Sequence, residues 1–182
     1  MSHTKQYLFQ SARLGFRHWE TTDIEPMAAI NADAVVMEFF SSTQTREQTA
    51  NFIERMQTQF SEKGFCYFAV DKLADHELIG FIGINVQNFE SDFTPCIDIG
   101  WRIKRSEWNQ GYATEGAMRC LAYAFHDLGI DLIVSITPLV NLKSEHIMQK
   151  IGMSKVKTFI FPLLKGDQRL EECVLYEISK PE

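Results

Sequence analysis

The stretch that decides the fold lies at residues 108–115 and reads Trp-Asn-Gln-Gly-Tyr-Ala-Thr-Glu. It begins where an apolar pattern typical of a strand gives way to a helical pattern. Gly111 removes a side chain that would block close approach, and Ala113 keeps the next turn small. Successive backbone N–H groups in such a turn converge on one point at the positive end of a helix. We therefore expect a phosphate or diphosphate to bind there, although a glycine that only eases the turn would leave the same short motif.

The composition around this stretch is that of an ordinary globular chain. Of the 182 residues, 45% are hydrophobic and 23% are charged, and no linker divides the sequence, which predicts one domain over residues 1–182. The net charge is -6 and the lysines and arginines are dispersed, so we expect no nucleic-acid partner. No apolar run has the length of a membrane span or the character of a signal peptide, which favours a cytoplasmic protein without a membrane partner.

Neither the cysteines nor the histidines are spaced as metal ligands. The four cysteines are scattered without a C-x-x-C pair, and no histidine has a histidine four residues away or a cysteine neighbour. We therefore expect reduced, mostly buried thiols, with no metal site and no disulfide. The residues concerned are Cys66, Cys96, Cys120, Cys173, His3, His18, His76, His126 and His146.

The hydrophobic pattern along the chain predicts both strands and helices. Capping-box sequences indicate helix starts at Thr22 and Thr45, and Gly64 ends the second of these helices. Further helices are expected at residues 112–128 and 142–151, and strands at 13–19, 65–71, 77–87, 94–103, 130–137, 159–164 and 172–178. This order predicts an α/β (α+β) domain with a central twisted mixed sheet of about seven strands and helices on both faces.

Two segments of the chain resemble the cofactor segments of the GNAT N-acetyltransferases. The first is residues 108–115, and the second is Asn-Leu-Lys-Ser at 141–144, followed by Gly-Met at 152–153. Trp108 stands where the family pattern has Gln or Arg, and this departure resembles the branch that contains the ribosomal-protein N-terminal acetyltransferases. Residues 12–23 are similar to the first strand and helix of that branch. The resemblance implies a GNAT-type domain that uses acetyl-CoA as cosubstrate, without a metal, and acetylates an amine.

The resemblance also implies roles for particular residues on the donor side. The main chain near Ile103 would pair with the pantetheine arm, and Asn141 would bind the pantetheine or the thioester. Asn is also a favoured helix cap, so Asn141 has a purely structural alternative. Ser144 would face the cofactor sulfur. Backbone amides of the turn would hold the pyrophosphate, and the residues around it are Trp108, Asn109, Gln110, Gly111, Tyr112, Ala113 and Thr114.

Asp98 is the candidate catalytic base. It matches an acidic position of that branch on the strand before the pyrophosphate turn, and it stands between Ile97 and Ile99. Apolar neighbours raise the pKa of a carboxyl and improve it as a base. The alternative is a carboxylate at a strand edge, paired with a cation. Many relatives carry a tyrosine seven residues after the asparagine, where it protonates the departing thiolate. This chain has Met148 at that position. The proton would then come from Ser144 or from a water, or the thiolate would leave without a proton.

The acceptor stays open at this stage. The resemblance favours a protein or peptide N-terminus, but small-molecule amines are accepted by similar folds, and a noncatalytic acyl-CoA-binding or sensing domain is a third possibility. The acidic loop at 88–92 suits a cationic acceptor. Trp19, Phe39 and Phe40 either line an acceptor pocket or belong to the core. An exposed hairpin edge at 159–164 is compatible with a homodimer as well as a monomer.

Overall fold

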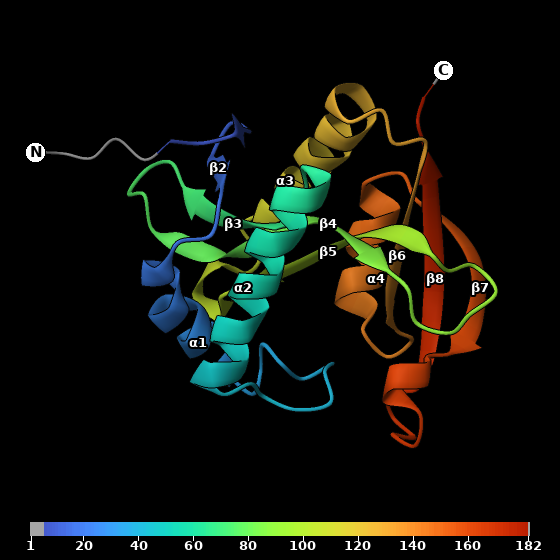
Figure 1. Cartoon of the computed structure of the whole chain (residues 1–182). Coiled ribbons are helices and arrows are strands. Elements are labelled where there is room, and N and C mark those ends of the chain that lie inside the picture. Colours follow the sequence, from blue (N-terminus) through green and yellow to red (C-terminus); the bar gives the residue numbers. More distant parts are fainter. Residues whose placement is uncertain (1–5, 182) are drawn as a thin grey trace, which may run out of the picture.

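One mixed sheet runs through residues 6–181, the part of the chain that this computed structural model describes (Figure 1). The described strands lie in the order β1-β2-β3-β4-β5-β6-β8-β7, and β5 with β6 is the one parallel pair among them. The prediction of about seven strands missed β1, whose two residues are too short to produce a hydrophobic pattern. The strands are β1 (Phe9–Gln10), β2 (Leu14–Arg17), β3 (Tyr67–Lys72), β4 (Leu78–Gln87), β5 (Cys96–Ile103), β6 (Leu132–Pro138), β7 (Ser154–Ile160) and β8 (Glu172–Ser179).

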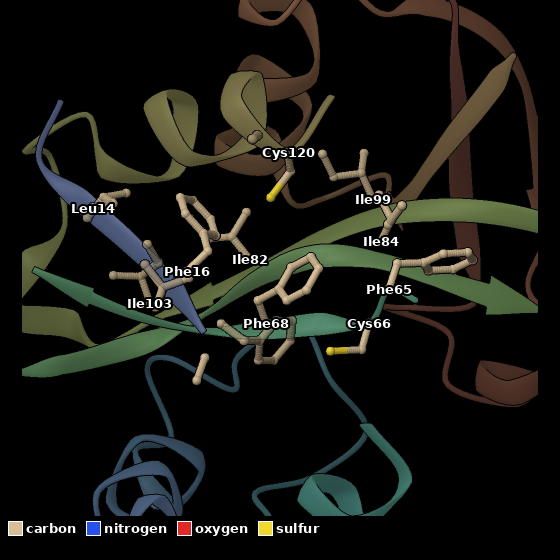
Figure 2. Packing of buried hydrophobic residues seen from close by; sticks show 14 of the residues in the cluster. Leu14, Phe16, Phe65, Cys66, Phe68, Ile82, Ile84, Ile99, Ile103 and Cys120 are labelled. Atoms are coloured by element: carbon tan, nitrogen blue, oxygen red, sulfur yellow. The ribbon is translucent and has the colours of Figure 1, made fainter. Parts of the chain in front are cut away.

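Helices cover both faces of the sheet, as the sequence predicts. α1 and α2 lie on one face and α3 lies on the other (Figures 1 and 2). α4 contacts α3 and β6. The helices are α1 (Ile24–Ala32), α2 (Arg46–Lys63), α3 (Tyr112–Ala122) and α4 (Leu142–Lys150), with short turns η1 (Thr21–Asp23), η2 (Arg105–Glu107), the π-helical η3 (Tyr123–Asp127) and η4 (Pro162–Leu164).

The capping signals are confirmed for α2 and wrong for α1. At α2, Thr45 Oγ1 accepts from the Gln48 amide at 3.1 Å, and Gly64 ends the helix with φ 79°. The capping box predicted at Thr22 lies two residues earlier, where the Asp23 carboxylate accepts from the Glu20 amide at 2.8 Å. The box is shifted because the same carboxylate also binds a buried arginine, which no local pattern indicates.

The last hairpin differs from its prediction at its first strand. Residues 159–164 read as a strand because they are apolar, but β7 is Ser154–Ile160. Pro162 has no N–H to donate to a ladder, and the short helix η4 starts there instead. β7 is the last strand of the sheet on that side, so an exposed edge is present but lies earlier in the chain than expected.

Close packing fixes α3 against the middle of the sheet. Cys120 points from α3 toward the sheet, where Ile82 and Phe16 lie (Figure 2). A Cβ at Gly116 would overlap Ile82 Cδ1, so a larger residue at 116 would force the Ile82 side chain to move. α3 thus packs closely on the sheet, in contact with β4 and β5.

The parallel strands β5 and β6 separate soon after they meet. Their ladder consists of the pair Asp98 and Val134. One residue further, the Ser135 hydroxyl donates to the Ile99 carbonyl at 3.0 Å. Beyond this bond β5 and β6 have no ladder pairing, and the gap between them leads to the N-terminus of α3.

Candidate active site

A cavity of about 730 Å³ lies where β5 and β6 separate. One part is lined by the turn before α3 and by the start of α4, and the other part by aromatic side chains from the face that α1 and α2 cover. Asp98 and Arg102 of β5 line the same cavity. The two parts therefore meet at the separated strands.

The turn before α3 presents unpaired amides to this cavity. Asn109 and Gly111 have φ values of 60° and 81°, and Gly111 is the N-cap of α3. The amides of residues 109–114 donate no hydrogen bond to another described residue. Trp108 connects the turn to the end of β5, because its Nε1 donates to the Ile103 carbonyl at 2.8 Å. Free N–H groups at the positive end of a helix fit a diphosphate.

Of the residues expected around the phosphate, all but Gln110 line the cavity. Cavity-lining residues are Trp108, Asn109, Gly111, Tyr112, Ala113 and Thr114. Gln110 is exposed and does not line the cavity, and its carbonyl accepts from Arg13 at 3.0 Å. Only the Gln110 amide remains available to a ligand, while its side chain and carbonyl face elsewhere.

Glu115 ties the N-terminal segment to the start of α3. Its carboxylate accepts from the Ser11 hydroxyl at 2.7 Å, and from the Arg13 amide and Nε at 2.8 and 2.7 Å. These bonds hold the pKa of the Glu115 carboxyl below its ordinary value despite partial burial. The residue thus braces the turn from outside the cavity.

The ladder between β4 and β5 directs alternate peptide groups of β5 into the gap. The Lys104 amide donates to the Ile79 carbonyl at 2.8 Å, so the even-numbered residues of β5 bond to β4. The odd-numbered residues face β6, as the Ile99 carbonyl already shows. The amides of Trp101 and Ile103 therefore point toward the opening between the strands.

Asp98 lies at the centre of a hydrogen-bonded group of three side chains. The Tyr67 hydroxyl contacts both of its carboxylate oxygens, at 2.7 and 2.8 Å, and Gln87 Nε2 donates to Oδ2 at 3.1 Å. The side chain is buried but lines the cavity, and no described cation pairs with it. The alternative of a carboxylate at a strand edge, paired with a cation, is therefore wrong.

Burial sets the protonation of this group. It raises the pKa of the Asp98 carboxyl to about 6, although the bonds from Tyr67 and Gln87 oppose the rise. Burial and the adjacent carboxylate also hold the pKa of the Tyr67 phenol well above its usual range. At neutral pH the phenol is consequently a donor and Asp98 an acceptor.

Asn141 and Ser144 form the cap of α4 at the cavity wall. Asn141 Oδ1 accepts from the Ser144 amide at 3.3 Å, while its Nδ2 donates to Thr137 Oγ1 at 2.9 Å and to Ser144 Oγ at 3.1 Å. The structural alternative for Asn141 is thus confirmed. Both Nδ2 hydrogens are used, and one lone pair of Oδ1 is left for a ligand. The Ser144 hydroxyl donates to no other described residue.

A family model described as an acetyltransferase (GNAT) domain matches residues 13–154. The chain belongs to the GNAT acetyltransferase family. GNAT domains use acetyl-CoA as acyl donor, so the chain is an acetyl-CoA-dependent N-acetyltransferase of the GNAT type.

Similar proteins agree with this assignment. An uncharacterized N-acetyltransferase, YnaD of Bacillus subtilis, is 27% identical over 161 residues, 88% of this chain and 90% of that protein. The FsC-acetyl coenzyme A-N(2)-transacetylase of Aspergillus fumigatus is 33% identical over 99 residues, 54% of this chain but 41% of that enzyme. A GNAT-family acetyltransferase structure from Bacillus anthracis has a TM-score of 0.78 at 26% identity, covering 95% and 98% of the two chains. The ribosomal-protein branch stays a prediction, because none of these matches is specific to it.

Two expectations about the aromatic end of the cavity are corrected by the structure. Phe39 and Phe40 line the cavity, but Trp19 is buried elsewhere and its Nε1 donates to the Tyr67 carbonyl at 2.6 Å. The acidic side chains of the loop at 88–92 do not line the cavity, and Asp92 pairs with Lys157 of β7 at 2.6 Å. A preference for cationic acceptors therefore has no support from that loop.

The cavity residues that the sequence reasoning missed include Tyr67, Gln87 and Arg102. Each is a polar side chain inside an apolar strand pattern, which was the available signal. Their meeting depends on register, since Gly83 lies opposite both Tyr67 and Gly100. A Cβ at Gly100 would lie 3.2 Å from the Tyr67 ring, so two glycines let that ring lie flat toward Asp98.

Metal-binding clusters and membrane-spanning helices can be assessed for the described residues. Within residues 6–181, no three or more His, Cys, Asp or Glu side chains gather as metal ligands. His3 lies outside the described residues. No helix in the same range is long and apolar enough to cross a membrane.

Proposed function

We propose that this GNAT enzyme transfers the acetyl group of acetyl-CoA directly to a small primary amine, with Asp98 as the base. The observation that carries the proposal is the buried carboxyl of Asp98, held by Tyr67 and Gln87 on the wall of the cavity between the separated strands. A pKa of about 6 leaves this carboxyl ionised at neutral pH and still basic enough to accept a proton, directly or through water.

Donor binding would use the opposite part of the cavity. The free amides of residues 109–114 hold the diphosphate, and Asn141 Oδ1 accepts from an amide of the pantetheine arm through its remaining lone pair. The Ile103 amide, or that of Trp101 beside it, donates to the acetyl oxygen. Bound acetyl-CoA supplies the activated acetyl group.

The chain's own groups then balance the protons of the transfer. A C–N bond to the amine forms and the C–S bond of the thioester breaks. Asp98 takes a proton from the amine and then releases it to solvent. The Ser144 hydroxyl, which donates to no other described residue, is placed to pass a proton to the leaving sulfur and regains one from solvent, so both groups return to their starting state. Met148 is buried in the core and has no proton to give, so a tyrosine-type acid is absent from that position.

A small acceptor is favoured by the lining of the aromatic end of the cavity, which we assign to the acceptor. Phe39, Phe40 and Phe81 give this acceptor end apolar walls, which suit an apolar substituent better than an extended peptide backbone. The Aspergillus relative is named for transfer from acetyl coenzyme A to an N(2) nitrogen, which agrees with an amine acceptor. The second candidate is a peptide N-terminus, favoured by the resemblance of residues 108–115 to the ribosomal-protein branch.

The test is acceptor-dependent release of thiol from acetyl-CoA across a panel of small amines and short peptides. We expect release with one or more small amines and tight binding of coenzyme A by calorimetry. Binding of coenzyme A without thiol release for any acceptor would contradict the proposed transfer and favour a noncatalytic acyl-CoA sensor. Release with peptides alone would move the acceptor to the second candidate.

A further inference from the structure

Arg102 is a buried cation without a described anionic partner. Its side chain stands on β5 and is 7% exposed. Nη1 donates to Asn31 Oδ1 at 2.7 Å, and the Nε hydrogen has no partner among residues 6–181. None of the described ion pairs includes this residue. A charge removed from water without a counterion is costly, so an unpaired arginine at this position calls for an explanation.

Aromatic rings meet only part of this cost. The guanidinium carbon lies 4.2 Å from the centroid of the Phe40 ring and 5.3 Å from that of Phe81. Such contacts occupy the faces of the planar group and do not use the N–H donors of Nε and Nη2. Burial lowers the pKa of Arg102 to about 10, so the group stays charged at neutral pH. The Nε and Nη2 edge is the fork that binds a carboxylate through two parallel hydrogen bonds.

The position of this edge relates it to the acceptor. Arg102 and Asp98 are four residues apart on one strand, so their side chains leave the same face of the sheet. Both line the cavity, and the amides of Trp101 and Ile103 point into the gap beside them. The acceptor part of the cavity therefore has a carboxylate base at one position on its wall and a cation at another.

We infer that the acceptor is a small amine that also carries a carboxylate, and that Arg102 binds this carboxylate while the amine faces Asp98. The inference rests on the proposed function, because it names the substrate class of the same site. The rings of Phe40 and Phe81 suit an apolar substituent on such an amino acid. A diamine or polyamine would bring a second positive charge against Arg102 and is disfavoured.

The experiment compares acids with their amides. Apolar α-amino acids and ω-amino acids of two to six carbons are each paired with the corresponding carboxamide, and kcat/KM is corrected for the fraction of free amine. Wild type is expected to prefer at least one acid by about tenfold or more, as charged hydrogen bonds of this kind typically contribute. Arg102→Met should abolish the preference, mainly through KM. Arg102→Lys should keep part of it, and Arg55→Met, an exposed arginine on α2, should keep all of it.

A binding measurement makes the test independent of turnover. The probe is 3-phenylpropanoate, which has a carboxylate and a ring but no amine, titrated into wild type saturated with coenzyme A. We expect binding that weakens about tenfold in Arg102→Met, with circular dichroism confirming the fold of the variant. Absence of binding to folded wild type, or equal binding by Arg102→Met, would overturn the inference.

Failure of the inference and failure of the proposed function look different. If diamines or amides drive thiol release as well as the acids do, the acceptor class is wrong while the transferase stands. If no amine drives release but 3-phenylpropanoate binds through Arg102, the carboxylate site stands and the transfer fails.

Discussion

At the residue scale, the chemistry of the cavity depends on what surrounds Asp98. Two neutral donors, Tyr67 and Gln87, hold the carboxyl in place, and burial makes it a stronger base than an exposed aspartate. The flanking isoleucines predicted this direction. The donors themselves came from other strands, so no spacing along the chain pointed to them.

Replacing Asp98 with Asn should reduce kcat by about two orders of magnitude or more at neutral pH, the usual contribution of a general base. The affinity for coenzyme A should hold, because in the proposed mechanism the amides of residues 109–114, and not Asp98, hold the diphosphate. In wild type, kcat/KM should fall as pH drops through about 6, since protonation removes the base. Steady-state kinetics over a pH series measure both. Unchanged turnover in Asp98→Asn would remove this residue from the mechanism.

Replacing Tyr67 with Phe should shift that acidic limb upward. The phenol stabilises the ionised carboxylate, so its loss raises the pKa of Asp98 further above its ordinary value. Activity at pH 6 should therefore fall more than activity at pH 8. Tyr123→Phe is the matched control, because that hydroxyl bonds to no described residue. Superimposable pH profiles for wild type and Tyr67→Phe would show that the phenol does not tune Asp98.

At the element scale, the helices were predicted better than the strands that end near prolines. Both ends of α2 were predicted from single residues next to them, Thr45 at the start and Gly64 at the end. The strand predicted at 159–164 lies earlier, at Ser154–Ile160, because the apolar run continues past the point where Pro162 ends the strand pairing. The turn before α3 was predicted correctly because its glycine and the helix start are contiguous in sequence; its binding of a diphosphate stays a prediction.

Gly111 gives the element-scale prediction for that turn. Its φ of 81° is left-handed, and Gly111→Ala should cost about 1–2 kcal/mol of stability through backbone strain. It should also weaken coenzyme A binding, because a strained turn re-aims the free amides. Gly129→Ala is the matched control, since Gly129 has φ 66° with open space around it. Calorimetric titration of both variants should show weakened binding for Gly111→Ala alone, and equal affinities would contradict the role of the turn.

At the scale of the whole molecule, a buried ionic network joins β2 to the turn η1 and to the strand β3. Arg17 is 2% exposed and bonds Asp23 of η1 at 2.7 Å and Asp71 of β3 at 2.8 Å. Facing these carboxylates raises the pKa of the Arg17 guanidinium above its ordinary value. Arg17 lies in β2, whose four residues are all buried. Its partners lie 6 and 54 residues away, beyond any local pattern.

Arg17→Met should lower the free energy of unfolding by about 3–5 kcal/mol, because it removes a buried cation that bonds two buried carboxylates. Urea denaturation measures the change. Arg46→Met is the control: its pair with Glu25 is largely exposed, so the loss should stay within about 1 kcal/mol. Equal losses in the two variants would mean that the buried network adds no stability of its own.

The central claim is that the amides before α3 grip the diphosphate of coenzyme A while the thioester lies between β5 and β6. Amide chemical shifts of the isotope-labelled protein, followed during a titration with coenzyme A, test it most directly. We expect the largest changes at residues 109–114 and at Trp101 and Ile103, with the distant turn at 165–168 unaffected. Unchanged amides at 109–114 under saturating coenzyme A would contradict the account.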